Sequence, residues 1–285
     1  METIVCKFGG TSTADGGAAK RVMQIAEANA ARRYIVVSAP GKRFAGDIKI
    51  TDLLYSAAAA AKARRAKEYR KIYAKVRGRF LEIARDTGAD ERFLSDLKAE
   101  IEETEEKIYL GASEAFAASR GEVLAAKIFS RLIGAPYIGA EELISFSEDG
   151  TLDKTTFDKV QARLSGVGRA VIPGFYGRGA DGKIHTFPRG GGDITGAVIA
   201  RGVRADLYEN WTDVSGVYAG DPKKNRGAAA LPFLTYREFA ALQGASVLHE
   251  KAAAVAGEAG IPIRILNTFR PEDQGTTIAF APAKT

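Results

Sequence analysis

The 285-residue sequence has one cysteine and two histidines, and each scarcity excludes a class of protein. A single cysteine, Cys6, permits neither an intrachain disulfide framework nor a cysteine-rich zinc site. The histidines, His185 and His249, are too far apart to show the spacing of a metal-binding pair. No stretch supplies the roughly 18 uninterrupted apolar residues of a membrane span, and the polar N-terminus does not resemble a signal peptide. We therefore expect a soluble, cytoplasmic protein.

Positive charge is in modest surplus, with 41 Lys and Arg against 35 Asp and Glu. The surplus permits an anionic partner, such as nucleic acid, a membrane surface or a phosphorylated ligand, without choosing among them. Its densest part is residues 62–79, with nine bases and one acid, and an acidic stretch follows at 80–106. We interpret these stretches as two helices with facing opposite charges rather than as a nucleic acid-binding surface.

Apolar residues alternate between strand and helix patterns along most of the chain. A strand at 4–8, a glycine turn, a helix and a strand at 34–38 form the succession that is typical of a parallel sheet covered by helices. This predicts one α/β domain with an inserted helical hairpin. The other expected strands are 170–173, 184–187, 206–211 and 262–267, and the other expected helices are 53–85, 93–108, 121–133, 193–201, 236–243 and 250–258.

The first glycine-rich turn, Lys7-Phe8-Gly9-Gly10-Thr11-Ser12, follows the first expected strand. Its glycines allow the backbone to approach an oxyanion closely, and the N–H groups at a helix start favour negative charge. Lys7 would add a positive charge near bound phosphates. An ordinary turn with a surface lysine is the alternative.

The second turn, Arg189-Gly190-Gly191-Gly192-Asp193, also lies between an expected strand and a helix. Three consecutive glycines cost conformational entropy, which a bound ligand would justify. Arg189 could clamp a carboxylate with its planar fork, and Asp193 could cap the helix, orient Lys7 or help to hold Mg²⁺. Two anion sites without a credible nucleophile favour direct phosphoryl transfer, although neither turn has the P-loop pattern.

A third cluster makes a family recognisable. It consists of Asn210-Trp211-Thr212-Asp213-Val214-Ser215-Gly216-Val217-Tyr218 and Gly220-Asp221-Pro222-Lys223. Together with the two glycine turns, this cluster resembles the aspartate kinases of the amino-acid-kinase superfamily. Further matching segments are Ser38, Thr51-Asp52-Leu53-Leu54, Ser119-Arg120-Gly121-Glu122, Gly244-Ala245-Ser246-Val247-Leu248-His249 and Ile261-Pro262-Ile263-Arg264.

The resemblance implies a single catalytic domain over residues 1–285, built as a three-layer αβα sandwich with a central, mostly parallel sheet. About 1–175 would be the amino-acid-binding lobe, with a helical insertion at about 53–109, and about 176–285 the ATP-binding lobe. The implied reaction is the ATP-dependent phosphorylation of the β-carboxylate of L-aspartate, with Mg²⁺ on the nucleotide, at the start of the lysine, threonine and methionine pathways. The implied partners are small molecules, neither nucleic acid nor a membrane, and a homodimer is left open.

The resemblance also implies roles for individual residues. Lys7 and Asp193 would be catalytic, with Lys7 stabilising the transferring phosphoryl group and Asp193 organising Lys7 and the acceptor. Glu122 would face the α-amino group of the substrate and Arg189 a carboxylate. The implied substrate site comprises Ser38, Thr51, Glu122, Arg189 and Gly192. The implied nucleotide site comprises Lys7, Gly9, Gly10, Thr11, Ser12, Thr212, Asp213, Tyr218, Asp221 and Lys223.

Three departures from the family pattern keep alternatives open. Gly192 stands where the family usually has serine, which allows a paralogous kinase acting on another acidic amino acid. Ser246 stands where the family usually has a nucleotide-contacting lysine, which allows a non-catalytic, nucleotide-binding regulatory subunit. The third departure is length. Because the sequence ends where the catalytic domain usually gives way to ACT domains, we expect neither those domains nor feedback by lysine or threonine.

Overall fold

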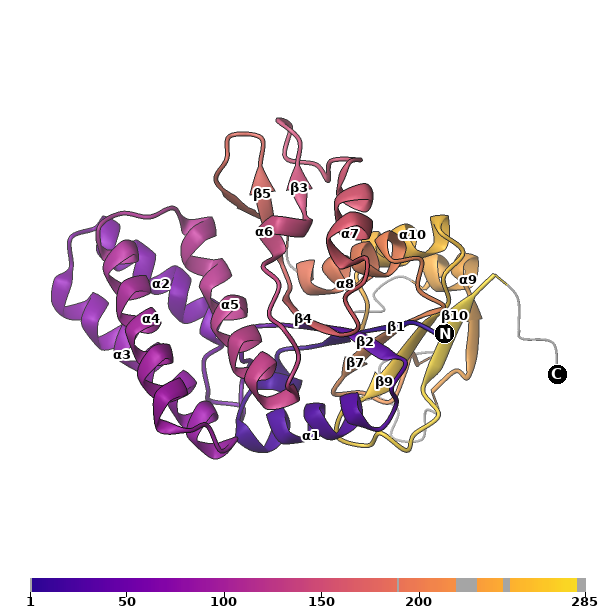
Figure 1. Ribbon diagram of the computed structural model, residues 1–285, viewed down its shortest axis with the longest axis horizontal. Coiled ribbons are helices and arrows are strands. Elements are labelled where there is room, and N and C mark those ends of the chain that lie inside the picture. The colour runs from indigo at the N-terminus through magenta and orange to yellow at the C-terminus, as the bar shows by residue number, and fades with distance from the viewer. Residues whose placement is uncertain (1, 189, 219–229, 243–246, 281–285) are drawn as a thin grey trace.

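The central sheet of the molecule has seven strands between two layers of helices (Figure 1), in a computed structural model that describes residues 2–188, 190–218, 230–242 and 247–280. Neighbouring strands are parallel except for the β9–β10 pair, which is antiparallel. The expected α/β sandwich is thereby confirmed. The spatial order is β4 (Ala170–Pro173), β2 (Arg32–Val37), β1 (Ile4–Phe8), β7 (Leu207–Thr212), β9 (Ile263–Asn267), β10 (Thr276–Ala279) and β8 (Phe233–Thr235).

Two hydrophobic cores lie on the two faces of this sheet, because side chains alternate along each strand. In β1, Cys6 and Phe8 enter one core and Val5 enters the other. The first core is covered by α1 (Gly16–Glu27), α2 (Ile50–Lys62), α3 (Ala66–Asp86), α4 (Glu91–Tyr109) and α5 (Glu114–Ile133). The second is covered by α6 (Ala140–Leu143), α7 (Thr156–Leu164), α8 (Gly191–Gly202), α9 (Tyr236–Ala241) and α10 (Glu250–Glu258).

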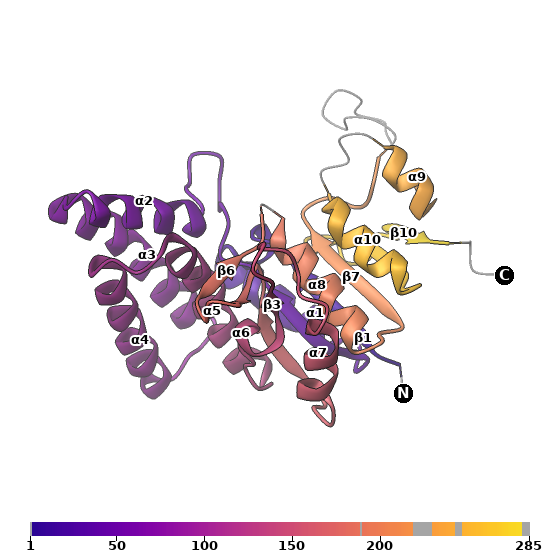
Figure 2. The ribbon, with the colours of Figure 1, turned by 90° about the horizontal axis from the view of Figure 1, so that it is seen from above.

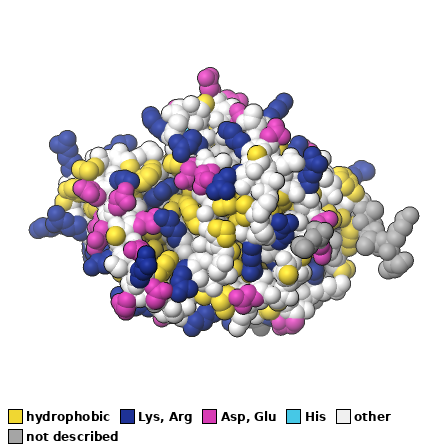
Figure 3. All heavy atoms as spheres, viewed as in Figure 1, with side chains coloured by type: hydrophobic (Ala, Val, Ile, Leu, Met, Phe, Trp, Pro, Cys, Tyr) yellow, Lys and Arg dark blue, Asp and Glu magenta, His cyan; other side chains and the backbone are white. Residues whose placement is uncertain are grey.

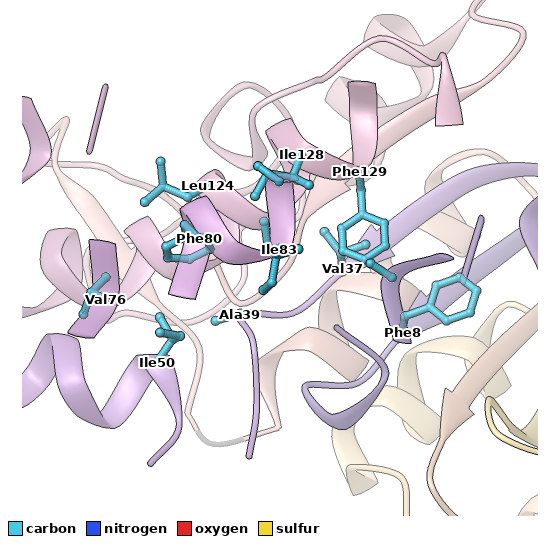
Figure 4. Close-up of a cluster of buried hydrophobic side chains, with 14 of the residues drawn as sticks. Phe8, Val37, Ala39, Ile50, Val76, Phe80, Ile83, Leu124, Ile128 and Phe129 are labelled. Carbon is cyan, nitrogen blue, oxygen red and sulfur yellow. The ribbon is translucent and has the colours of Figure 1, made fainter. Parts of the chain in front are cut away.

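The first core joins the sheet to helices α2 to α5, which follow β2 in the sequence. Figure 4 shows Phe8 and Val37 of the sheet beside Phe129 of α5, with Ile83 of α3 next to them. Ala39, two residues after β2, belongs to the same cluster and is almost fully buried. The carboxyl end of the sheet is therefore packed directly against the helical region.

The single helix expected over 53–85 is wrong, because α2 ends at Lys62 and α3 begins at Ala66. Arg64, between them, has a left-handed φ of 56°. A continuous helix of this length would extend about 50 Å and leave the core. The reversal instead allows both helices to bury their apolar faces against the same cluster.

The expected pairing of basic and acidic helices is partly realised in α3 and α4. Arg77 of α3 forms an ion pair with Glu105 of α4, and the Tyr73 hydroxyl donates to the Ile101 carbonyl across the same contact. Figure 3 shows Lys and Arg side chains interspersed with Asp and Glu over this region. The visible surface here carries both signs of charge, which favours neutralisation between helices over an extended anion-binding face.

Several short elements were not predicted. They include a second sheet of three strands and the short 3₁₀ turn η1 after the first glycines. Strands of two to four residues show no readable alternation, so the sequence carries little signal for them. The unpredicted elements are β3 (Ser145–Phe146), β5 (Tyr176–Gly179), β8, β10, η1 (Thr11–Thr13), α6 and α7, and the second sheet has the order β3, β5, β6 (Ile184–Thr186). Within the described ranges, no helix combines the length and hydropathy of a membrane span.

Strand β1 lies between β2 and β7, so the strand order reverses at β1: β2 and β4 lie on one side of it, and β7, β9, β10 and β8 lie on the other. The carboxyl ends of β1, β2 and β7 are followed or occupied by Gly9, Ser38 and Thr212. Ligands of open α/β sheets bind outside the carboxyl ends of strands, at a point where the strand order reverses. The fold therefore brings three of the predicted site segments to one edge.

Candidate active site

Lys7 and Asp193 form a nearly buried ion pair at this edge. Lys7 lies on β1, in register with Val36 and Asn210 of the neighbouring strands. Its Nζ is 2.6 Å from Oδ1 of Asp193, in the first turn of α8, and the two side chains are only 10% and 12% exposed. Charges held this far from water interact strongly because little solvent screens them.

Asp193 orients Lys7 and does not cap its own helix. The residue that precedes α8 is Gly190, and no side chain caps this helix. The second oxygen of Asp193, Oδ2, accepts the backbone N–H of His249 at 3.0 Å, and the Tyr208 hydroxyl donates to the Asp193 carbonyl. The capping interpretation is therefore wrong, because no side chain caps α8.

Backbone hydrogen bonds hold both ends of the first glycine turn, and the N–H groups of two residues lie between these bonds. The Gly9 N–H donates to the Trp211 carbonyl at 3.0 Å, and the Ser12 N–H donates to the Gly9 carbonyl at 3.0 Å. Among the described residues, the N–H groups of Gly10 and Thr11 have no acceptor. These two groups are therefore the backbone donors that the turn offers to an anion.

The Ser12 side chain points into the interior of the protein. It is fully buried, and its Oγ lies 2.7 Å from Oγ1 of Thr268, after β9. Thr13, which sequence reasoning missed, has its Oγ1 within 3.1 to 3.4 Å of the carbonyl oxygens of Gly9, Gly10, Ser38 and Ala39. Thr13 thus ties the turn to the end of β2, and its position directly after the motif was the only available signal.

Ser38 and Gly192 face each other beside Lys7. A Cβ built on Gly192 would lie 3.0 Å from Ser38 Oγ and 3.3 Å from Lys7 Cε. Glycine therefore lets the start of α8 approach the ends of β1 and β2 more closely than most residues could. The structure brings Ser38, Gly192, Asp193 and Lys7 together, which agrees with the site that the family resemblance implies.

Glu122 on α5 is a buried carboxyl group, with 5% of its surface exposed. Burial raises its pKa to about 8, and the Ala39 backbone N–H and the Arg120 guanidinium oppose this shift without cancelling it. Its Oε2 has no hydrogen-bond partner among the described residues. A buried carboxyl oxygen without a partner is costly, so this atom is suited to accept from a ligand.

The remaining predicted residues are more dispersed. Thr51 is half-buried in the first turn of α2, and Asp213 is exposed, with Oδ1 accepting from the Thr212 hydroxyl at 3.3 Å. Tyr218 forms an isolated bridge with Ala230. The predicted residues Arg189, Asp221 and Lys223, and the departure Ser246, lie outside the described residues.

Phe175 is a further residue of the site that the sequence did not single out as functional. It has a left-handed φ of 78°, which is unusual for a bulky residue. Its N–H donates to Oγ1 of Thr195 on α8, and its carbonyl accepts from the Phe187 N–H. Such backbone strain gathers at functional sites, and here it fixes the segment that faces the glycines of α8.

Known proteins resemble this chain in both sequence and fold. Residues 2–267 match the amino acid kinase family. Aspartokinase 3 of Bacillus subtilis is 33% identical over 96% of this chain and 63% of its own length. The crystal structure of Clostridium acetobutylicum aspartate kinase superposes with a TM-score of 0.91 at 40% identity, over 100% of this chain and 64% of that chain.

Escherichia coli aspartokinase III, in a complex with aspartate and ADP, superposes with a TM-score of 0.81 at 25% identity, over 99% of this chain and 66% of that chain. This chain thus spans less than two thirds of the length of the first two relatives named above, 63% and 64%. Because the family match covers most of the sequence in a single run, this chain belongs to the amino acid kinase family.

Proposed function

We propose that this protein is an ATP-dependent kinase that phosphorylates the β-carboxylate of L-aspartate, giving 4-phospho-L-aspartate and ADP, at the start of the lysine, threonine and methionine pathways. The observation that carries the proposal is the Lys7–Asp193 pair, held at 2.6 Å with Lys7 Nζ next to Gly9. In the same turn, the Gly10 and Thr11 N–H groups have no acceptor among the described residues. The similarity to an aspartokinase that binds aspartate and ADP supports it.

In the proposed reaction, a carboxylate oxygen of the substrate attacks the γ-phosphorus of ATP, and the bond to the leaving β-phosphate oxygen breaks. Catalysis of this kind depends on positioning and on neutralising charge on the transferred group. Lys7 supplies the positive charge, and Asp193 holds it toward the glycine turn. The Gly10 and Thr11 N–H groups would bind phosphate oxygens.

The amino-acid substrate would bind between the end of β2 and helix α5. The Oε2 of Glu122, which has no partner in the described part of the chain, would accept from the substrate α-ammonium group. Ser38, Thr51 and Gly192 would line the same space. Arg189 would hold a carboxylate. Thr212, Asp213, Tyr218, Asp221 and Lys223 would contribute to the ATP site, so that about 1–175 serves the amino acid and about 176–285 the nucleotide.

Mg²⁺ enters this proposal with the nucleotide. Within the described part of the chain, no group of three or more His, Cys, Asp and Glu side chains is placed to hold a metal ion. Asp193 is already engaged by Lys7 and by the His249 N–H. Since Mg²⁺ is usually bound through substrate phosphates and one or two carboxylates, the phosphates would carry the ion, which supplies neutralising charge at the transferring group.

The test is a substrate panel with ATP and Mg²⁺, in which hydroxylamine traps any acyl phosphate. We expect trapped product from L-aspartate and little from L-glutamate, D-aspartate or L-asparagine, with ADP formed in equal amount. Turnover of another acidic amino acid in preference to L-aspartate would contradict the substrate. Nucleotide binding without turnover of any member would support the regulatory subunit instead.

Gly192→Ala should weaken aspartate binding modestly. The new methyl group would stand 3.0 Å from Ser38 Oγ, and such crowding costs on the order of 1 kcal/mol, or about a fivefold higher KM for aspartate. The KM for aspartate and kcat, measured by the trapping assay, check this. In the double variant Gly192→Ala/Ser38→Ala the contact with Ser38 Oγ is gone and only the 3.3 Å contact with Lys7 Cε remains, so its KM should lie close to that of Ser38→Ala alone.

A further inference from the structure

Arg79 is buried, although it belongs to the basic stretch 62–79. It lies on α3 and is 5% exposed. Its Nη1 donates to the carbonyl oxygens of Ala14 and Gly41 at 3.3 and 3.1 Å, and its Nη2 contacts Asp47 at 2.6 Å. A buried guanidinium requires such partners, and all of these lie in segments that border the candidate active site.

The contacts of Arg79 lead directly to the glycine turn. The Gly41 N–H donates to the Gly10 carbonyl at 2.7 Å. A Cβ on Gly41 would lie 2.6 Å from the Gly10 carbonyl carbon, so the two backbones touch. At the far end of the same loop, residues 40–50, the Ile50 N–H donates to the Pro40 carbonyl at 3.0 Å. The 40–50 loop thus connects Ser38, the glycine turn and Thr51.

Apolar packing contributes little to holding the middle of this loop. Phe44 is 62% exposed and Ile48 is 43% exposed, and Figure 2 shows the loop projecting beside α2. A cavity of about 370 Å³ separates it from α3, and its lining includes Asp47, Lys75 and Arg79. The position of the loop therefore depends on polar contacts.

Among those polar contacts, the Arg79 bonds are the most sheltered. Arg43 also pairs with Asp47 and with Glu82, but its side chain is 29% exposed, and that of Glu82 is 49% exposed. Exposed ion pairs contribute little because water screens them. The Arg79–Asp47 pair has side chains only 5% and 11% exposed. It is accordingly the least solvent-exposed ion pair between α3 and the loop among the described residues.

We infer that Arg79 is a positioning residue, whose guanidinium holds the 40–50 loop against the glycine turn so that Ser38 and Thr51 stand correctly with respect to Lys7. The inference rests on the proposed function for its kinetic consequence. Its structural part, the placement of the loop, does not depend on which substrate is phosphorylated.

The kinetic test compares Arg79→Met with Arg79→Lys and with Arg77→Met. Loss of a charged hydrogen-bond network should raise the KM for L-aspartate about tenfold, while kcat at saturating substrate stays within about threefold, because Arg79 touches no reacting atom. Lysine keeps the charge but not the planar fork, so Arg79→Lys should recover part of the affinity. Arg77→Met removes an ion pair between α3 and α4 and should leave the KM unchanged.

The second test measures amide hydrogen exchange in the 285-residue protein without substrate, with Asp47→Asn as a variant from the loop side that leaves α3 intact. Exchange at residues 41–49 should become at least tenfold faster in Arg79→Met and Asp47→Asn, but not in Arg77→Met. Unchanged exchange in Asp47→Asn would overturn the inference, as would an equal rise in KM for Arg77→Met. If the wild-type protein phosphorylates no amino acid, the proposed function fails, and loop exchange still decides the role of Arg79.

Discussion

Replacing Lys7 by methionine should lower kcat by roughly a hundredfold to a thousandfold, the usual effect of removing one preorganised donor to a developing charge. The loss should appear in kcat more than in KM, because charge on the transferring group is greatest in the transition state. Lys7 is held by Asp193 at 2.6 Å in a site with little water. Acyl-phosphate trapping at saturating ATP and aspartate gives the measurement.

Matched variants separate this catalytic effect from a general loss of structure. Lys20→Met removes an exposed lysine from α1 and should leave kcat unchanged. Asp193→Asn should reduce kcat strongly, since the amide cannot hold the Lys7 charge. Because residues that act as a unit are not additive, the double variant Lys7→Met/Asp193→Asn should be little worse than Lys7→Met. A near-normal kcat for Lys7→Met would refute the proposed role of Lys7.

The affinity for aspartate should increase with pH up to about pH 8, and Glu122 should be responsible. In the free protein, burial raises the pKa of Glu122 to about 8, so the group is mostly protonated at neutral pH. A substrate ammonium group beside it would favour the carboxylate and lower that pKa. Binding would therefore release a proton, and affinity would rise by up to about tenfold per pH unit below pH 8.

Glu122→Gln should abolish this pH dependence and weaken aspartate binding by about tenfold to a hundredfold, the value of a charged hydrogen bond. Titration calorimetry in buffers of different ionisation enthalpy reports the released proton directly. Equal proton release by wild type and Glu122→Gln would assign the titration to another group.

The free energy of unfolding supplies the control for Glu122. The contribution of Glu122 to it should fall as pH rises, whereas the affinity for aspartate should rise. The folded-state pKa of this acid is raised above its unfolded value of about 4.3. The folded state then binds more protons between these pKa values, so the contribution of Glu122 to stability falls as pH rises through that window. Glutamine does not ionise. The variant should thus lose less stability than the wild type between pH 5 and pH 8, as denaturant titrations would show.

The sheet and the core of the site were predictable because their signals are local. Strand β1 occupies residues 4–8 as expected, and helix α10 occupies residues 250–258 as expected. Lys7 and Asp193 were predicted from the two glycine turns, and Ser38 and Gly192 from the resemblance to the aspartate kinases. The sheet brings these residues together because parallel strands have their carboxyl ends at one edge. A βα succession thus predicts proximity among residues far apart in the sequence.

The contacts that hold these residues in place were not predictable. Arg79 appears in the sequence as one base among nine in residues 62–79, and only tertiary packing brings it to the Gly41 carbonyl. The break at Arg64 was missed because no glycine or proline marks it. In both cases the local structure depends on a backbone group or a core surface that a distant segment contributes. The residue types alone do not reveal such a contact.

The surroundings of Trp211 give the protein a built-in optical reporter. This is the single tryptophan of the chain, it is 2% exposed, and its carbonyl accepts the Gly9 N–H at the glycine turn. Its ring stacks on Phe8, and its Nε1 donates to the buried Glu209 carboxylate. Tryptophan fluorescence, excited at wavelengths that the ten tyrosines do not absorb, therefore arises from one site next to the glycine turn. Nucleotide titrations and unfolding can both be followed on the unmodified protein without attaching a dye.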